Sequence, residues 1–568
     1  MGLSSSLQIG RSGLLAGQTG IEVTGNNLSN ITTRGHHRQS VTLVPSRSQE
    51  IQRGVFLGQG VEVQQVVRHV NEALESRLRS GIADQSYSAT RQTLLSQIEA
   101  VQNELSDIDL STQLSEFFNA FSEMALSPED NAARTVVIQQ GQTLASFARN
   151  LRSDLTAQLR QLDDTLNEAA IAADDLLTQI AQVNQEIVQT ERGAGGAHGL
   201  RDERDMLLGE LSQFLDISTV EHTNGSVDVF VGSLPVVLNN NNRGIELRQE
   251  TVNGQPQIDV VIKDNNSELQ MTSGRLAALV DGGGNDINNA INVLDNFVSE
   301  LIFQVNRVHS QGQALEGFSS VTGTSVIADT TVPLNDPAAA LDFLPTHGSF
   351  QIHVTQTSTG QRTSATINID LDAIAVPADT TLNSLVASIN TVTGVTATIT
   401  PDGRLQIASN GSDLAISFSD DSSGVLAALG INTFFSGHNA GDIDVNPIVQ
   451  QNPGMVSAAT GHVPGSNGTA LGIAGLRDQA IPTLNGLSLI ETWNRHVQDY
   501  AVRAGQAQQR LEADTIVREN LESQQQAVSG VNADEEAINL LVFQRAYQGS
   551  ARFISVVDEL LQTLLSLV

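Results

Sequence analysis

Cysteine is absent from the 568-residue chain, and lysine is almost absent, since Lys263 is the only one. Without cysteine the chain has no disulfides, no thiolate nucleophile and no cysteine-ligated metal. The nucleotide-binding P-loop requires a Gly-Lys pair, and Lys263 follows Ile262, so this class of NTPase is excluded. Aromatic residues make up only 4% of the chain, so any core depends on aliphatic side chains.

Basic residues are also scarce, because 30 Lys and Arg stand against 63 Asp and Glu, which gives a formal net charge of −33. Binding to nucleic acid or to an anionic membrane surface needs a basic stripe, so we expect neither as a partner. No run approaches about 18 apolar residues, and the first residues lack the basic segment of a cleaved signal peptide. We therefore expect no membrane span and no cleaved signal.

The sequence does contain matched apolar stripes at its two ends. In both, apolar residues recur in steps of three and four, which is the period of a coiled-coil seam. Gly10 and Gly17 lie in the N-terminal stripe and would let a second helix approach closely. A helical hairpin within one chain would explain either stripe alone, but the match between the two ends favours assembly with other subunits.

The C-terminal stripe is the wider one. Apolar residues beyond its seam exceed what one partner helix would cover, namely Leu541, Phe553, Val556, Leu560 and Leu565. The assembly interface that we expect combines seam residues with asparagines of a motif described below: Leu3, Leu7, Leu14, Ile21, Asn26, Asn27, Leu28, Asn30, Leu540, Phe543, Tyr547, Ile554, Val557, Leu561 and Leu564.

The two ends also carry opposite charge. Residues 1–48 contain four arginines and one glutamate, whereas residues 533–568 contain two arginines and five acidic residues. Attraction between them would favour their association, although exposed ion pairs contribute under about 1 kcal/mol each.

Long helical patterns fill much of the chain between the ends. The spacing predicts helices at about residues 66–105, 144–187, 286–308 and 484–526. These are longer than the helices of a typical α/β enzyme.

Two β-rich stretches interrupt the helices. Around residues 214–272, strand-like runs are joined by Asn224-Gly225 and Asn253-Gly254, which are strong hairpin signals. Residues 349–420 predict the order strand–strand–helix–strand–strand, with loop-rich flanks.

The expected fold class is therefore α+β and multidomain, with a long helical bundle or coiled-coil rod built from both chain ends and two β-rich inserted domains. We expect residues 1–60 with 527–568 to form a terminal coiled-coil assembly domain. The other expected domains are a long-helix rod domain (61–200 with 274–321 and 476–526), a β-rich domain (201–273) and an inserted strand–helix module with loop-rich flanks (322–475).

A search for catalytic constellations finds none. His36 and His37 are adjacent, so in regular structure they point in different directions, and we expect solvated loop histidines rather than a metal chelate. The run from Asp281 to Asp286 lacks the spaced acidic ligands of a calcium loop and is better explained as a turn capping the next helix. We expect no enzymatic activity, no cofactor and no bound metal.

Motifs at both ends carry a family resemblance. Asn26-Asn27-Leu28-Ser29-Asn30 with Thr33-Arg34-Gly35 resembles the N-terminal signature of bacterial flagellar rod, hook and hook-associated proteins. The segment from Ser529 to Glu536, followed by Phe543-Gln544-Arg545-Ala546-Tyr547, resembles the C-terminal partner signature of the same family.

Three interior motifs are similar to the hook-associated members that form the first junction between hook and filament. They are Arg201-Asp202-Glu203-Arg204-Asp205, Asn306-Arg307-Val308-His309, and the run from Leu429 to Gly437. The inserted module is similar to small strand–helix modules of flagellar axial proteins. Two positions depart from the family pattern, since His36 stands where tyrosine is usual and Gly549 where alanine is common.

The resemblance implies an extracellular structural subunit of the bacterial flagellum, exported without a cleaved signal and joining hook to filament. Its implied partners are further copies of the chain in a ring layer, the hook protein, the second hook–filament junction protein, and an export chaperone at the C-terminal helix. Another axial subunit of the hook or rod shares the terminal signatures and remains an alternative. A secreted coiled-coil adhesin and a flagellar protein with a catalytic insertion are less favoured, because no anchor and no metal motif is visible.

Overall fold

The computed structural model describes residues 3–52, 54–102, 109–192, 196–252, 255–372, 379–463 and 465–566. The chain divides into two compact units: unit 1 comprises residues 1–93, 162–284 and 506–568, and unit 2 comprises residues 94–161 and 285–505. Three long helices contribute residues to both units, namely α2 (Glu72–Gln102), α4 (Asn131–Glu191) and α12 (Leu489–Ser529). The fold is α+β and multidomain, with long helices at both chain ends, as the sequence predicts.

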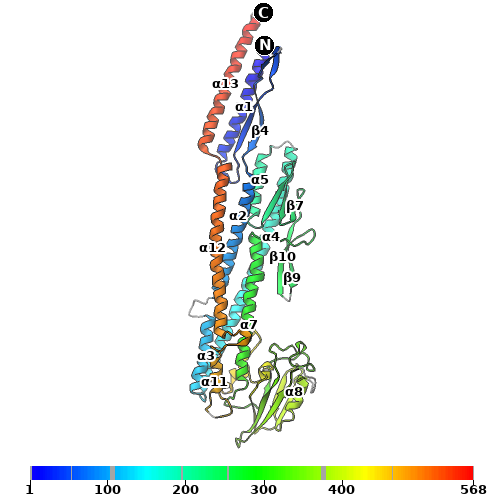
Figure 1. Ribbon diagram of the computed structural model, residues 1–568, viewed down its shortest axis with the longest axis vertical. Helices are drawn as coiled ribbons and strands as arrows, with labels where there is room; N and C mark the ends of the chain where they lie inside the picture. Colours follow the sequence, from blue (N-terminus) through cyan, green and yellow to red (C-terminus); the bar gives the residue numbers. More distant parts are fainter. Residues whose placement is uncertain are drawn as a thin grey trace. The chain divides into compact units, whose positions relative to one another are not determined.

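The two chain ends form an antiparallel helix pair in unit 1. Helix α1 (Leu3–Ser29) and helix α13 (Ala533–Ser566) lie side by side, with both termini at the same end of the pair (Figure 1). Strands β1 (Gln39–Pro45) and β4 (Val61–Arg68) pair antiparallel and contact α1. The small hairpin of β2 (Gln49–Gln52) and β3 (Val55–Leu57) lies between them in the sequence.

The first β-rich region follows helix α5 (His198–Leu211), also in unit 1. A four-stranded antiparallel sheet has the order β5-β6-β7-β8, and a separate hairpin pairs β9 with β10. The strand bounds are Ile217–Glu221, Val227–Val231, Leu234–Leu238, Asn241–Asn242, Ile245–Val252 and Gln255–Ile262 for β5 to β10. The hairpin predicted at Asn224-Gly225 is confirmed, because β5 pairs with β6 and Gly225 has the positive φ of 86° that such a turn favours. Asn253-Gly254 lies outside the described residues.

Unit 2 combines helices with the inserted strand–helix module. Its helices include α3 (Leu110–Leu126), α7 (Asn288–His309) and the shorter α11 (Gly468–Gly475). Buried phenylalanine rings of α3 contact Phe434 and Phe435, with ring centroids 5.3–5.6 Å apart. Several of the scarce aromatic residues thus form one cluster in this core.

The module consists of two three-stranded antiparallel sheets in the orders β13-β12-β16 and β11-β15-β14, with helix α8 beside them. The predicted order strand–strand–helix–strand–strand is confirmed, and the structure adds β16 at the end and the short β11 at the start. The bounds are Ser320–Thr322 (β11), Gly348–Gln356 (β12), Arg362–Ile369 (β13), Leu382–Ile389 (α8), Val395–Ile399 (β14), Leu405–Ser409 (β15) and Leu414–Ser419 (β16). Short elements follow: α9 (Val425–Ala428), β17 (Phe435–Ser436), β18 (Asp444–Val445) and α10 (Pro447–Gln451).

Helix starts are where the sequence predictions were least accurate. The helix expected from about residue 66 begins at Glu72, because Val66 belongs to β4 and the Asn71 side chain accepts a hydrogen bond from the Leu74 amide at 3.2 Å. The helix expected from about residue 484 (α12) begins at Leu489, where Ser488 and Glu491 form reciprocal capping hydrogen bonds of 2.9 and 3.2 Å.

The segment from Asp281 to Asp286 is not a capping turn, so that prediction was wrong. Helix α6 (Arg275–Asp281) continues through a π-helical segment, Gly282–Ile287, directly into α7. The Tyr500 hydroxyl donates a hydrogen bond to the Asp286 carbonyl at 2.8 Å. Tertiary contacts of this kind select a widened helix that sequence spacing does not reveal.

Candidate assembly surface on the terminal helices

A stripe of four glycines on α1 packs against one face of α13. Gly10, Gly13, Gly17 and Gly20 face Ile554, Ser550, Tyr547 and Phe543, respectively. A β-carbon placed on Gly17 would lie only 3.1–3.2 Å from backbone atoms of Tyr547. The close approach predicted at Gly10 and Gly17 is confirmed, and the second helix is the C-terminal helix of the same chain.

The predicted C-terminal seam therefore faces α1. Phe543, Tyr547, Ile554 and Leu561 are half-buried on this face, and Val557 is buried. Leu540 is half-buried as well, whereas Leu564, which the period places in the seam, is 51% exposed. The intramolecular pair thus accounts for most of this stripe.

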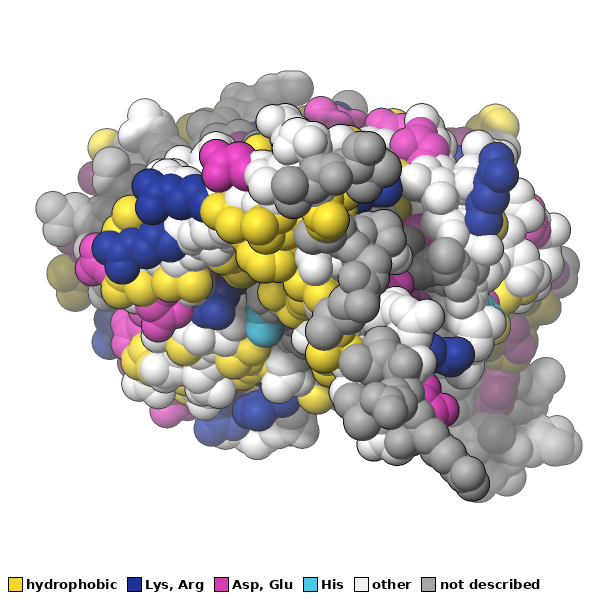
Figure 2. Space-filling model, turned by 90° about the horizontal axis from the view of Figure 1, so that it is seen from above, with side chains coloured by type: hydrophobic (Ala, Val, Ile, Leu, Met, Phe, Trp, Pro, Cys, Tyr) yellow, Lys and Arg dark blue, Asp and Glu magenta, His cyan; other side chains and the backbone are white. Residues whose placement is uncertain are grey.

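A second apolar face of α13 stays exposed. Leu541, Val556 and Leu560 are 52–54% exposed, and Phe553 is exposed as well. Leu565 is also exposed, but it lies one turn after Leu561 on the seam side. These residues are the ones that widen the stripe in the sequence. Ile538 and Val542 belong to the same exposed set, and sequence reasoning missed them although they share its helical spacing. Figure 2, a view onto the end that carries both termini in Figure 1, shows hydrophobic side chains gathered among charged ones.

Most of the predicted apolar residues of α1 are half-buried. Leu7, Leu14, Ile21 and Leu28 are half-buried, and Leu3 is the first residue of the helix. The neighbouring Leu15 is exposed. The N-terminal stripe is therefore largely covered by the chain's own helix α13 and by strands β1 and β4.

The asparagine motif closes α1 and anchors the next strand. Asn27 is fully buried, donates from its side-chain amide to the Gln39 carbonyl at 2.8 Å, and accepts from the Gln39 amide at 3.0 Å. Asn30 donates to the Asn26 carbonyl at 3.0 Å and accepts from the Thr33 hydroxyl at 3.1 Å. The geometry supports a structural role for Asn27 inside the chain, because no atom of it faces solvent.

One contact joins the oppositely charged chain ends. Arg38 lies 3.1 Å from the carboxylate of Glu535 and 3.4 Å from that of Glu536, and its backbone amide donates to the Ser529 carbonyl. The attraction predicted from charge is therefore realised at the start of α13.

The adjacent histidines are not solvated, so that prediction was wrong. Both contact Asp202, with His36 Nδ1 at 3.3 Å and His37 Nδ1 at 2.8 Å from its two oxygens. His37 is 3% exposed, and its Nε2 lies 3.6 Å from Glu75. Burial alone would lower the pKa of His37, but the hydrogen bond to Asp202 and the nearby carboxylate of Glu75 outweigh it and raise the pKa to about 9.

The motif 201–205 on α5 supplies this network. Arg68 of β4 binds Asp202 at 2.9 Å and Asp205 at 2.5 Å, so the two acidic residues hold the loop 36–38 and the sheet together. Sequence reasoning singled out the motif but could not find its partners, which lie more than 130 positions away.

The two other interior motifs meet in a buried polar cluster of unit 2. Asn306 donates to the Phe435 carbonyl at 2.9 Å and accepts from the amides of Phe434 and Phe435. His309 Nδ1 donates to the Asn432 carbonyl at 2.8 Å, and its Nε2 accepts from the Ser457 amide at 2.9 Å. Burial lowers the pKa of His309 to about 4, so the ring is neutral at pH 7. These motifs fix a loop through buried polar groups.

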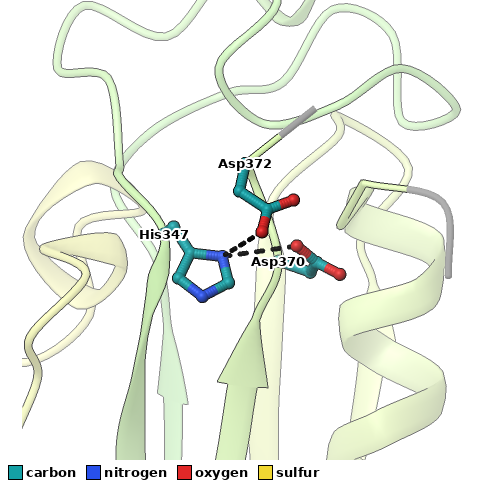
Figure 3. Close-up of side chains that lie close together, drawn as sticks. All are labelled: His347, Asp370 and Asp372. Atoms are coloured by element: carbon teal, nitrogen blue, oxygen red, sulfur yellow. Dashed lines mark ion pairs between the residues drawn. The ribbon is translucent and has the colours of Figure 1, made fainter. Parts of the chain in front are cut away.

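Among the described residues, one group of three potential metal ligands has its ligand atoms within 4.8 Å of one another, namely His347, Asp370 and Asp372. His347 and Asp370 flank the last residue pair of the β12–β13 ladder, Gly348 with Ile369. Figure 3 shows both carboxylates on the Nδ1 side of the His347 ring, with Nδ1 at 3.3 Å from an oxygen of Asp370 and 3.9 Å from one of Asp372. All three side chains are partly exposed and these distances are those of ion pairs, so we assign no metal to the group.

Three family models match parts of the chain. The flagellar hook-associated protein FlgK helical domain matches residues 95–324, the flagellar basal body rod FlgEFG protein C-terminal model matches residues 524–567, and the flagellin hook IN motif matches residues 357–411. The second match contains α13, and the third lies within the inserted module. None of the described helices has the length and apolar character needed to cross a membrane.

Full-length relatives agree with these matches. The chain is 25% identical over 570 residues to flagellar hook-associated protein 1 of Bacillus subtilis, covering 99% of this chain and 97% of the relative. It is 23% identical over 582 residues to the protein of the same name from Escherichia coli, with both chains covered completely. The solved structure of the flagellar hook junction protein FlgK from Burkholderia pseudomallei superposes with a TM-score of 0.50 at 16% identity, covering 80% of this chain and 100% of that one. The last comparison shows a shared fold.

Proposed function

We propose that this chain, which belongs to the family of flagellar hook-associated protein 1, is a structural subunit that joins the hook of a bacterial flagellum to the filament. The observation that carries the proposal is the exposed apolar face of α13, defined by Leu541, Val556 and Leu560. An apolar face of this kind at a chain end is what an axial subunit needs to bind its neighbours.

The contacts divide between the two faces of the terminal pair. The glycine stripe of α1 and the α13 seam hold the chain ends together, while the exposed face of α13 packs against helices of neighbouring subunits. Burying one large aliphatic side chain completely stabilises by about 1.5–3 kcal/mol, and a half-exposed residue still has about half of this to gain. Several such residues per subunit, repeated around a ring, supply a stable layer.

We assign this assembly role to residues 1–60 with 527–568. In this proposal the layer contacts the hook protein on one side and the second hook–filament junction protein on the other. The remaining domains in this proposal are residues 61–200 with 274–321 and 476–526, residues 201–273, and residues 322–475.

Export comes before assembly. We propose that the chain passes unfolded to the outside of the cell without a cleaved signal, and that an export chaperone covers the apolar face of α13 until then. The absence of cysteine agrees with this route, because an exported chain of this kind depends on no disulfide. The family is one of structural flagellar proteins, and we assign the chain no catalytic activity.

The test is localisation in the source bacterium by immunogold labelling of intact flagella. We expect label confined to the boundary between hook and filament, and a strain that lacks the chain should make hooks without attached filaments. Label along the whole filament or along the hook would reject the junction role. Deletion of residues 533–568 should abolish incorporation of the chain into flagella. Normal motility after that deletion would contradict the assembly role of α13.

A further inference from the structure

Unit 2 contains a polar groove of 690 Å³ between the first turn of α3 and residues 139–150 of α4. Binding sites for small ligands have volumes of about 300–1,000 Å³. Most of the lining residues carry a side-chain amide, and these are Gln113, Gln139, Gln140, Gln142 and Asn150. No acidic or basic side chain of the described residues lines the groove, although the chain has a formal net charge of −33. The groove is therefore polar and uncharged.

Gln113 distinguishes this groove from an ordinary solvated helix face. It is 7% exposed, yet its side-chain amide forms no hydrogen bond with any residue that the structure describes. An amide has two donors and one acceptor, and leaving such a group buried without partners costs about 1–3 kcal/mol. Because Gln113 lines the groove, a polar ligand placed there would supply the missing partners.

The α4 wall offers further unused amides. The side chains of Gln139 and Gln142 also form no hydrogen bond with the described residues. The two hydroxyls of this wall are partly occupied, since Thr143 donates to the Gln139 carbonyl at 2.9 Å and Ser146 accepts from Arg149 at 3.2 Å. The amides therefore supply most of the hydrogen-bonding capacity that remains for a ligand.

This lining disfavours three classes of ligand. A charged ligand finds no counter-charge among the described lining residues, and an apolar ligand finds one hydrocarbon side chain, the half-buried ring of Phe147. An extended peptide finds no strand edge, because both walls are helices whose backbone groups are bonded internally.

A neutral sugar matches what the groove offers. Its hydroxyls donate and accept hydrogen bonds, as side-chain amides do. The C–H groups on one face of a sugar ring form an apolar surface that can lie against an aromatic ring. We propose that this groove binds a neutral oligosaccharide, with its hydroxyls hydrogen-bonded to Gln113 and Gln142 and one sugar ring against Phe147.

A helix of a second copy is the competing occupant. Packed helices bury ridges of side chains that are mostly apolar, and the groove offers Phe147 alone for such a contact. The composition of the groove therefore favours a sugar. The proposal does not depend on the flagellar role, because every lining residue belongs to unit 2 of one chain.

The test uses the full-length chain and saturation-transfer difference NMR, which detects weak binding through the protons of the sugar. The probes are the neutral trisaccharides maltotriose, cellotriose and chitotriose. Trigalacturonate, which carries a carboxylate on each ring, is the ligand control. We expect transfer to at least one neutral trisaccharide and none to trigalacturonate. Transfer to none of the neutral probes, or equal transfer to trigalacturonate, overturns the proposal.

Substitutions locate the bound trisaccharide. Gln113→Leu should weaken its binding by about two- to tenfold, as expected for loss of a neutral hydrogen bond, and Phe147→Leu should weaken it as well. The melting temperature of Gln113→Leu should not fall, because the side chain forms no hydrogen bond within the described chain. Gln179→Leu is the matched control, since Gln179 is exposed on α4 outside the groove. Unchanged affinity in Gln113→Leu, or equal loss in Gln179→Leu, contradicts the assignment.

Analytical ultracentrifugation distinguishes the sugar from a second copy. We expect the sedimentation of Gln113→Leu to equal that of wild type. Self-association that is present in wild type and lost in Gln113→Leu, with no trisaccharide bound, would identify a second copy as the occupant and overturn the proposal.

Discussion

The terminal helix pair and the inserted module bury their apolar side chains to very different extents. In the module, Phe350, Ile352, Leu385 and Phe418 are all within 1% of complete burial, because helix α8 and two small sheets enclose one core. In the terminal pair, Val557 is the one buried hydrophobic residue of α13 among those described, and several apolar side chains remain exposed.

The difference follows from geometry. Sheets with a helix beside them surround a core on several sides, whereas two paired helices bury only the faces that touch. A helix with two apolar faces is therefore complete only when a further element covers the second face. The core of the module is completed within one chain, whereas in our proposal neighbouring subunits cover the second face of α13.

Removing a side chain from the core of the module should have the largest effect on the stability of the free chain. Phe418→Ala removes a completely buried ring, so we expect the module to lose about 3–5 kcal/mol of stability. Hydrogen exchange of the β12 and β16 amides measures the loss. Exchange in α1 and α13 should not change, because distant sites act independently. Equal acceleration in both regions would contradict the view that they are separately stabilised.

Two buried histidines should make the stabilities of units 1 and 2 respond to pH in opposite directions. The pKa of His37 is raised from 6.5 to about 9, so its contribution to unit 1, on the order of 3 kcal/mol, is fully present below pH 6.5 and lost as the pH rises through 9. The pKa of His309 is lowered from 6.5 to about 4, so unit 2 loses stability as the pH falls from 6.5 through 4.

Urea titrations over this pH range, read by hydrogen exchange in each unit, test both responses. His37→Gln should remove the alkaline loss in unit 1 and leave the acid response of unit 2 intact. A loss of unit 1 stability between pH 6.5 and 9 that persists in His37→Gln would show that another group is responsible.

Local periodicity predicted much of the fold but not the partners of each face. The seam of α13 could be found because Phe543, Tyr547 and Ile554 recur at coiled-coil spacing, and the strand order of the module followed from alternation and turn residues. Gly10 and Gly17 indicated that a second helix approaches closely, but they could not show whether that helix was α13 of the same chain or a helix of another subunit.

Long-range polar contacts could not be predicted at all. The residues next to His37 in the sequence do not indicate that it contacts Glu75 or Asp202, and an adjacent pair of histidines is usually solvated. The widened helix at 282–287 and the added strand β16 likewise depend on tertiary packing that overrides local preference. The sequence showed that the apolar stripe of α13 is wider than one partner helix covers. Only the structure shows which part of the stripe contacts α1 and which part stays exposed.

Filling the glycine stripe should separate the terminal helices and leave the module unchanged. Gly17→Leu places a side chain against the Tyr547 backbone, which cannot move aside as a flexible side chain could, so we expect the pair to lose about 1–3 kcal/mol. Hydrogen exchange in α13 should accelerate. Gly25→Leu on the same helix is the matched control, because no atom lies within 4 Å of a β-carbon there. Equal protection of α13 in the two variants would mean that the close approach is not what holds the pair.

The variant with the smallest expected effect on the stability of the free chain should lose assembly completely. Val556→Ser with Leu560→Ser changes residues that are 52–54% exposed, so the stability of the isolated chain should shift by no more than about 0.5 kcal/mol. Incorporation into flagella, measured by immunogold labelling, should nevertheless fail, because each subunit would lose apolar area that its neighbours bury. Ile516→Ser is the matched control, since Ile516 is 60% exposed on α12, outside the terminal pair. Normal incorporation of the double variant, or equal failure of Ile516→Ser, would show that the exposed apolar residues of α13 have no special role in assembly. The difference in burial between the module and the terminal pair would then not explain assembly.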